Sequence, residues 1–318
     1  MPDPIPPTLR SAVAGRAPDP LGDGTGPSGD AWLRSLPRRL DERLAAWDLV
    51  PEGPGIPAWH GECALVVPVR RADGSPAALK ITWPHEEART EHLALRRWDG
   101  RGAVRLLAAH PADLALLLER LDGDRDLHAL GLLDACEEIG TLLARLDTPA
   151  PARIPTLHDQ VPRWRARLAR PTPLVPRRLL QQAASHLEAL TAHAPGTPDQ
   201  QRLVHTDLHF ANVLAPLDAA RGAWLAIDPK PLAAEGAFAV APAVWNRADE
   251  AARAHSLAAH VRLRAGIIGD AAGLDEDRVR AWTFVRLVLN AVDASDHAPG
   301  SDAFRGRMIA LAGAFANP

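Results

Sequence analysis

The sequence predicts an α+β protein of two lobes: a small N-terminal lobe built on an antiparallel sheet and a helical C-terminal lobe. Three observations predict this fold. Residues 63–83 hold two apolar, β-branched runs around an Asp-Gly turn, which is the signal of a β-hairpin. Two further strand-like runs, at 103–110 and 114–121, follow a helical pattern. The rest of the 318-residue chain is mostly helical, with no repeat of fixed period.

The chain begins with a segment of low complexity. Residues 1–29 are rich in Pro, Gly and Asp with few apolar residues, and we predict a disordered arm. Residues 30–50 then show an amphipathic pattern that predicts a helix interrupted near Pro37, with Asp30 as its candidate N-cap.

The predicted N-terminal lobe covers residues 30–121. Lys80 lies on the second strand of the hairpin, and a helix is expected at about 85–98. Glu87 and Glu91 are four residues apart and therefore share one face of that helix.

The predicted C-terminal lobe covers residues 122–318. Two short strands, "RLVH" and "AWLAID", interrupt it, and the segment between them, "VHTDLHFANVLAP" at 204–216, is expected to lie on a β-hairpin. Helices are expected near 130–147, 174–193, 248–265, 277–293 and 302–315.

Charge and composition narrow the class of protein. The 36 basic and 39 acidic residues give a net charge of −3 without a long single-sign run, so neither nucleic acid nor an anionic membrane is an expected partner. Only Cys63 and Cys136 are present, and no stretch reaches the roughly 18 apolar residues of a membrane helix. These features predict a cytoplasmic protein and carry no signal for its oligomeric state.

The distribution of lysine is informative. Nearly every cation is arginine, and Lys80 and Lys230 are the only two lysines in the chain. A lysine is a compact point charge on a flexible stem, which suits contact with phosphate.

The segment His205-x-Asp207-x-x-x-x-Asn212 has the spacing of a kinase catalytic loop. In that chemistry the Asp accepts the proton of the substrate hydroxyl, and the Asn binds the metal. Asp228, at the end of "AWLAID", is then the second metal-binding carboxylate. A nucleotide and Mg²⁺ are what this set requires, and the residues leave both ATP and GTP open as the nucleotide.

The same chemistry assigns roles to the N-terminal lobe. Lys80 fits the strand lysine that holds the α- and β-phosphates, and a helix glutamate would fix its amine. We choose Glu91, with Glu87 as the rival.

Lys230 follows Asp228 by two residues, so on an extended backbone both side chains point to one side. Two interpretations stay open: Lys230 binds the transferring phosphate with the nucleotide, or it forms an ion pair with Asp228 that orders the strand end.

The histidines allow another hypothesis. We expect His205 to be structural, but His205-x-Asp207-x-His209 also resembles a zinc cluster of a hydrolase. That alternative leaves Asn212 and both lysines unexplained.

These motifs occur together in one known family. The segments "HTDLHFANVL", "WLAIDPKPL", "LALLLERL" and "ALKITWPHEEARTEHLALRRWDGRGAVRLL" resemble the aminoglycoside phosphotransferase family, in its streptomycin 6-kinase and hydroxyurea kinase branch, over residues 60–250. The resemblance implies a protein-kinase-like bilobal fold, with ATP, Mg²⁺ and transfer of the γ-phosphate to a hydroxyl of a small antibiotic-like molecule. By motif position, the resemblance implies that Asp207 is the catalytic base and that Asn212 and Asp228 are the metal ligands. It also implies that Lys80, with Glu91, holds the nucleotide phosphates. Two alternatives stay open: a kinase of an endogenous metabolite and a nucleotide-binding pseudokinase.

The chain departs from the pattern at two places. Similar sequences have an acidic residue shortly before an Ala-Pro pair, where this chain has Ala239 and its nearest acid is Glu235. The presumed phosphate-covering turn at 52–62 lacks Gly-x-Gly-x-x-Gly, and the chain has no Walker A motif.

The acceptor site is expected in the helical lobe, where a polycationic substrate requires carboxylates. Trp245 and Asn246 would line this pocket or pack beside it. The candidate acids, besides Asp207, are Glu235, Asp249, Glu250, Asp293 and Asp296.

Overall fold

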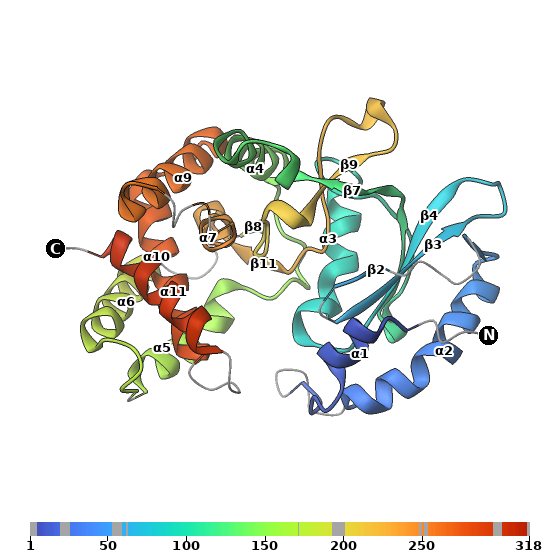
Figure 1. The fold of residues 1–318 in the computed structure, drawn as a ribbon, viewed down its shortest axis with the longest axis horizontal. Coiled ribbons are helices and arrows are strands. Elements are labelled where there is room, and N and C mark those ends of the chain that lie inside the picture. The colour runs from blue at the N-terminus through green and yellow to red at the C-terminus, as the bar shows by residue number, and fades with distance from the viewer. Residues whose placement is uncertain are drawn as a thin grey trace. The chain divides into compact units, whose positions relative to one another are not determined.

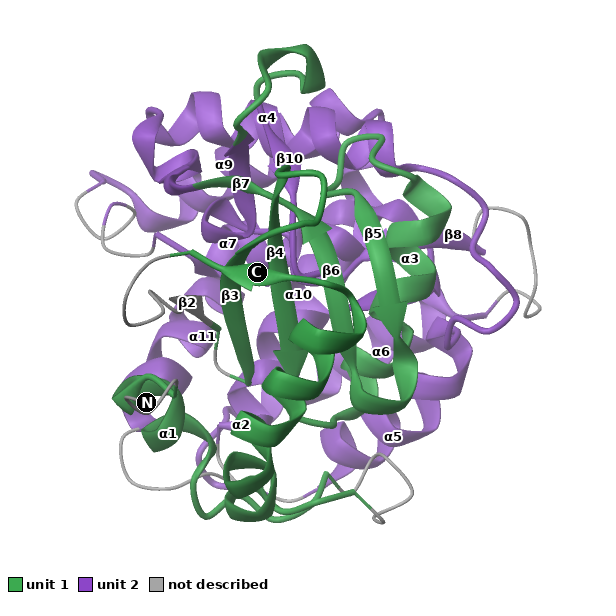
Figure 2. Cartoon of the chain, turned by 90° about the vertical axis from the view of Figure 1, so that its right-hand side faces the viewer, with its two compact units in different colours: residues 1–122, 216–223 green, residues 123–215, 224–318 purple. Residues whose placement is uncertain are grey.

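The computed structural model divides the chain into two compact units, which Figure 2 colours separately. Unit 1 comprises residues 1–122 and 216–223, and unit 2 comprises residues 123–215 and 224–318. The predicted α+β class is confirmed, since one unit is built on an antiparallel sheet and the other is mainly helical. The structure describes residues 5–19, 26–52, 59–61, 63–170, 172–192, 201–247, 250, 254–294 and 301–316.

An antiparallel sheet forms the frame of unit 1 (Figure 1). Its strand order is β1-β3-β4-β6-β5, and β2 pairs with β3. Lys80 lies on the central strand β4, opposite Val66 of β3 and Leu116 of β6. The predicted strands are confirmed because apolar residues on both sides of the Asp-Gly turn are buried in this sheet. The strands are β1 Val50–Pro51, β2 Trp59–His60, β3 Ala64–Arg70, β4 Pro76–Thr82, β5 Leu106–His110 and β6 Ala115–Glu119.

The helices of unit 1 correct the prediction for the first 29 residues. Helix α1 forms at Pro7–Val13 because its apolar residues Leu9 and Val13 are buried in the core of this unit. The prediction of a disordered arm is wrong for this stretch. The other helical segments are α2 Gly29–Ala46, η1 Glu86–Thr90, α3 Glu91–Trp98 and η2 Pro111–Asp113.

Helix α2 differs in detail from its prediction. Ser28, not Asp30, is the N-cap, because its side chain accepts a hydrogen bond from the N–H of Ala31. The helix also continues through Pro37, although a proline inside a helix costs about 3 kcal/mol. Buried apolar residues lie on both sides of Pro37, at Trp32 and Leu40 among others, and their burial offsets that cost.

Unit 2 is organised around helix α10, which packs against α5, α6, α7, α9 and α11. Four of the five predicted helices agree well. The helix predicted at 248–265 corresponds to α9 from Leu257 onward, and most of residues 248–253 lie outside the described residues. Helix α5 was not predicted; it begins with a capping box of Thr156 and Asp159. The helices are α4 Leu132–Leu146, α5 Leu157–Ala169, α6 Arg177–Leu190, α7 Ala241–Trp245, α9 Leu257–Ala272, α10 Glu276–Asp293 and α11 Ser301–Phe315.

The strand pairing around the polar loop is not the predicted hairpin. The segment "RLVH" forms β8, which pairs with β11, whereas β9 pairs with β10 and β7 in a separate sheet. The prediction is wrong because residues after the loop form a strand of their own, β9, which takes β10 as its partner. The elements are β7 Leu121–Asp126, β8 Arg202–His205, β9 Val213–Pro216, β10 Leu225–Ala226, β11 Pro231–Ala234, η3 Leu127–Ala129, η5 Phe210–Asn212, η6 Ala219–Arg221 and η7 Gly236–Ala239.

Two further findings concern the chain as described. Neither Cys63 nor Cys136 forms a disulfide bond. In the described ranges, no helix has the length and apolar character needed to cross a bilayer.

Candidate active site

Unit 1 contains a buried ion pair between two of the predicted site residues. The Nζ of Lys80 lies 2.6 Å from Oε1 of Glu91, and the two residues are only 5% and 3% exposed. Glu91 makes this pair, whereas the side chain of the rival Glu87 is exposed. Buried charges persist in proteins when they are paired, so the ammonium of Lys80 is held at a fixed place on β4.

Glu91 differs in one respect from its prediction. It is the first residue of α3 rather than a mid-helix residue. A carboxylate in the first turn interacts favourably with the positive end of the helix dipole. Both the helix end and Lys80 therefore stabilise its negative charge.

Unit 2 contains the loop at 205–212, which connects β8 to β9. Its first residue, His205, is 1% exposed. The His205 Nε2 lies 2.9 Å from the carbonyl oxygen of Ile227, and its Nδ1 accepts the backbone N–H of Asp207 at 3.2 Å. Burial lowers the pKa of His205 from 6.5 to about 4, which keeps the ring neutral and lets Nδ1 accept. The histidine is therefore a structural support of the loop.

The pKa of His205 predicts how stability depends on pH. Between pH 6.5 and 4 the imidazole of His205 is protonated in the unfolded chain but stays neutral in the folded protein. The free energy of unfolding therefore falls as the pH is lowered. The contribution of His205 to the free energy of unfolding is fully present above pH 6.5, and about 3 kcal/mol of it is lost by pH 4. Urea denaturation across this range should show a weaker pH dependence for His205→Gln than for the wild type.

The matched control is His255→Gln, which replaces an exposed histidine and should keep the wild-type pH dependence. Equal pH dependence of His205→Gln and the wild type would contradict the buried neutral ring.

Asn212 is connected directly to Asp207. Its Nδ2 donates to the backbone carbonyl oxygen of Asp207 at 2.9 Å. Its own backbone carbonyl accepts the N–H of Ile227, also at 2.9 Å. Because the amide nitrogen is used within the loop, Oδ1 is the atom that Asn212 offers to a ligand.

Asp228 has an unusual backbone conformation. Strand β10 ends at Ala226, two residues earlier than predicted, and Asp228 has φ = 52°. This left-handed conformation costs a non-glycine residue roughly 1–2 kcal/mol, and such outliers concentrate at functional sites. The negative charges of Asp207 and Asp228 both oppose the fall in the pKa of His205, so the two carboxylates lie near the same ring.

Lys230 forms an ion pair with the predicted base. Its Nζ lies 2.9 Å from Oδ2 of Asp207. Lys230 and Asp228 would point to one side only if the backbone between them were extended. Asp228 has a positive φ, so its backbone is not extended and this expectation no longer follows. The backbone carbonyl of Lys230 also accepts two hydrogen bonds from Thr206, from its N–H and its hydroxyl.

The alternative of a zinc cluster is wrong. Both ring nitrogens of His205 are engaged with backbone groups, which leaves none for a metal. Within the described parts of the chain, no group of three or more His, Cys, Asp or Glu side chains has a metal-binding arrangement. Burial lowers the pKa of His209, and its Nδ1 is buried without a hydrogen-bond partner among the described residues.

Three of the candidate acceptor acids are paired with arginines. Glu235 accepts hydrogen bonds from Arg278 and from the indole of Trp282. Glu250 lies 2.6 Å from Nε of Arg247, and Asp293 pairs with Arg167. Asp249, Asp296 and most of the turn at 52–62 lie outside the described residues.

The structure also reveals a residue that the sequence did not indicate. Arg286 of α10 donates from Nη2 to the carbonyl oxygen of Thr206 at 2.8 Å and from Nη1 to that of Phe238 at 2.9 Å. Its guanidinium lies over the ring of Trp245. One arginine among many on helices gives no signal in the sequence.

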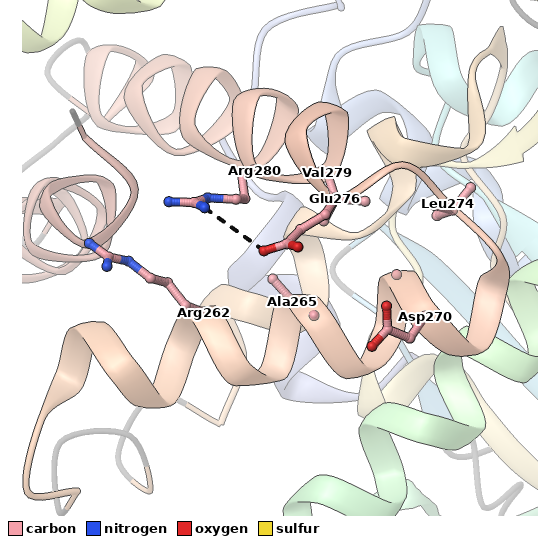
Figure 3. Close-up of a pocket in the computed structure, with 9 residues that line it drawn as sticks. Arg262, Ala265, Asp270, Leu274, Glu276, Val279 and Arg280 are labelled. Carbon is pink, nitrogen blue, oxygen red and sulfur yellow. Dashed lines mark ion pairs between the residues drawn. The ribbon is translucent and has the colours of Figure 1, made fainter.

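The cavities of unit 2 contain little of the candidate site. A cavity of about 50 Å³, shown in Figure 3, is lined by residues of α9 and α10, including the ion pair of Arg280 with Glu276. It includes none of the predicted site residues. A larger cavity of about 510 Å³ is lined by His205, Glu235 and Arg278 among others.

Solved structures define the class of this fold. The chain superposes on a choline/ethanolamine kinase family protein from Mesorhizobium loti with a TM-score of 0.60, 15% sequence identity and coverage of 87% of this chain and 94% of the other. It superposes on a macrolide 2'-phosphotransferase from Brachybacterium faecium with a TM-score of 0.51, 17% identity and coverage of 90% and 99%. The fold is that of protein-kinase-like small-molecule kinases.

Sequence relatives then give the family. A streptomycin 6-kinase from Streptomyces glaucescens is 39% identical over 297 residues, covering 90% of this chain and 91% of the relative. A hydroxyurea phosphotransferase from Kitasatospora aureofaciens is 42% identical over 280 residues, covering 84% and 75%. Residues 46–298 match the family described as aminoglycoside/hydroxyurea antibiotic resistance kinase. The chain belongs to this family and is a phosphotransferase that acts on a hydroxyl acceptor.

Proposed function

We propose that this enzyme transfers the γ-phosphate of ATP to a hydroxyl group of an aminoglycoside-like or hydroxyurea-like antibiotic. Asp207 is the catalytic base that accepts the proton of the acceptor hydroxyl as its oxygen bonds to phosphorus. ADP is the leaving group.

The observation that carries this proposal is the construction of the loop at 205–212. The Asp207 peptide N–H is held by a neutral histidine, and its carbonyl is held by Asn212. Such bonds fix the backbone and leave the carboxylate of Asp207, which is partly exposed, as the chemically available group. A fixed, accessible carboxylate is what a general base requires.

The residues present fit Mg²⁺. This ion prefers oxygen ligands, and Asp228 with the Oδ1 of Asn212 supplies them. The strained backbone of Asp228 and the unsatisfied Nδ1 of His209 support a ligand at this place. When bound, the ion would neutralise charge on the transferring phosphate, while Asn212 and Asp228 hold it.

Lys80 and Lys230 have separate proposed roles in binding the nucleotide phosphates. Lys80, fixed by Glu91, holds the α- and β-phosphates. Lys230 pairs with Asp207, so its ammonium lies beside the proposed base. We propose that the same ammonium contributes positive charge to the transferring phosphate.

The acceptor belongs to one of two chemical classes that the relatives' names indicate: a guanidino-cyclitol such as streptomycin, or hydroxyurea. The pairing of Glu235, Glu250 and Asp293 with arginines leaves these acids less suited to bind a polycation. Among the described candidate acids, Asp207 is the one that we place at the acceptor hydroxyl, through its proposed role as the base.

An ADP-release assay with streptomycin and hydroxyurea tests the proposal, and Asp207→Asn serves as the blank. We expect turnover that depends on one of the two acceptors, on Mg²⁺ and on Asp207. Turnover with neither would point to an endogenous acceptor. Nucleotide binding without turnover on any hydroxyl compound would make the chain a pseudokinase and refute the proposal.

A further inference from the structure

The peptide group between Thr206 and Asp207 is held at both of its edges. Its carbonyl oxygen accepts a hydrogen bond from Nη2 of Arg286 at 2.8 Å. Its N–H donates to the Nδ1 of His205 at 3.2 Å. Because a peptide group is planar, fixing both edges fixes its orientation, and the direction of the Asp207 side chain follows from it.

Arg286 is itself fixed. Its second arm donates to the carbonyl oxygen of Phe238 at 2.9 Å. Its guanidinium carbon lies 4.5 Å from the ring centroid of Phe238 and 5.1 Å from that of Trp245. A planar fork bound to two carbonyls and two aromatic rings has little freedom to move. Arg286 also belongs to α10, the helix against which five others pack.

The same guanidinium also holds a second segment. The carbonyl of Phe238, next to Ala239, accepts from Arg286, as the carbonyl of Thr206 does. A cation from α10 thus connects the loop to η7. Glu235, the acid nearest to Ala239 in the sequence, is bound instead by Arg278 and Trp282.

We propose that Arg286 is a positioning residue for the reaction: it holds the Thr206–Asp207 peptide so that the carboxylate of Asp207 faces the acceptor hydroxyl. The inference rests on the proposed function of Asp207 as the base. Arg286 acts through the loop backbone, so its loss should affect the rate of the chemical step more than the binding of either substrate.

Arg286→Lys tests this role and Arg278→Lys is its control. A lysine keeps the positive charge, but its single ammonium cannot reproduce the planar fork between two carbonyls. Arg278 lies two turns earlier on α10, is also partly buried, and contacts Glu235 rather than the loop. We expect kcat of Arg286→Lys to fall about 10- to 100-fold while both KM values change less than about threefold. For Arg278→Lys, kcat per folded molecule should stay within about twofold of the wild type.

Hydrogen exchange supplies a readout that does not need turnover. Peptides covering residues 205–212 should exchange about tenfold faster in Arg286→Lys and at the wild-type rate in Arg278→Lys, because only the first loses a bond to the loop. Faster exchange together with the lower kcat supports the proposal. If Arg286→Lys exchanges at the wild-type rate, or keeps the wild-type kcat per folded molecule, the proposal is refuted. A wild-type enzyme without Asp207-dependent turnover would instead refute the proposed function, and the exchange rates would then decide alone whether Arg286 anchors the loop.

Discussion

Asp207→Asn should reduce kcat about 1,000-fold or more while leaving the fold intact, since removal of a general base costs about 10²–10⁴ in rate. Asparagine has the same shape and keeps the backbone bonds to His205 and Asn212. It lacks only the basic oxygens that accept the proton. The lost ion pair with Lys230 is partly exposed, so its contribution to stability is at most about 1 kcal/mol.

Steady-state kinetics and urea denaturation of the same preparations check this result. Asp218→Asn is a matched control, because Asp218 caps η6 through a hydrogen bond to Ala220 that asparagine also makes. It should keep the wild-type kcat. If Asp207→Asn kept more than about a tenth of the wild-type kcat, base catalysis by this residue would be excluded.

The second large effect concerns the buried pair of Lys80 and Glu91. Lys80→Met leaves the Glu91 carboxylate buried without its partner, which should cost about 3–5 kcal/mol of unfolding free energy. The double variant Lys80→Met/Glu91→Leu removes both charges, and replacing a buried ion pair with apolar side chains is commonly neutral or stabilising. The double variant should therefore be about as stable as the wild type.

The single and the double variant should differ in stability but share the same loss of activity. Both Lys80→Met and the double variant lack the ammonium that we propose holds the nucleotide phosphates, so kcat/KM for ATP should fall about 100-fold or more in both. Denaturation and ATP-dependent kinetics on the three proteins make the comparison. A stable double variant with wild-type kcat/KM for ATP would show that the pair serves only the fold.

The two lysines illustrate how composition can indicate a site. In a chain that uses arginine almost everywhere, the structure places Lys80 in a buried ion pair and Lys230 against Asp207. Neither position is an ordinary solvated surface. Strand periodicity indicated Lys80, and the short spacing from Asp228 indicated Lys230, although the structure pairs Lys230 with Asp207.

What the sequence alone determined is local. The hairpin of β3 and β4, the choice of Glu91, and the spacing of Asp207 and Asn212 all depend on residues close in the chain, for which periodicity and motif spacing are sufficient. The α+β class and the family resemblance followed from the order of these elements and motifs along the chain.

The tertiary structure decided what depends on distant residues. The pairing of β8 with β11, the left-handed backbone of Asp228 and the bonds of Arg286 to Thr206 and Phe238 could not be predicted. The strand pairing and the bonds of Arg286 join segments that are distant in the sequence, which a local pattern does not relate. The positive φ of Asp228 ends the extended backbone that periodicity alone had predicted there. The sequence thus indicates candidate reactive groups, whereas contacts between distant segments fix the backbone that carries Asp207.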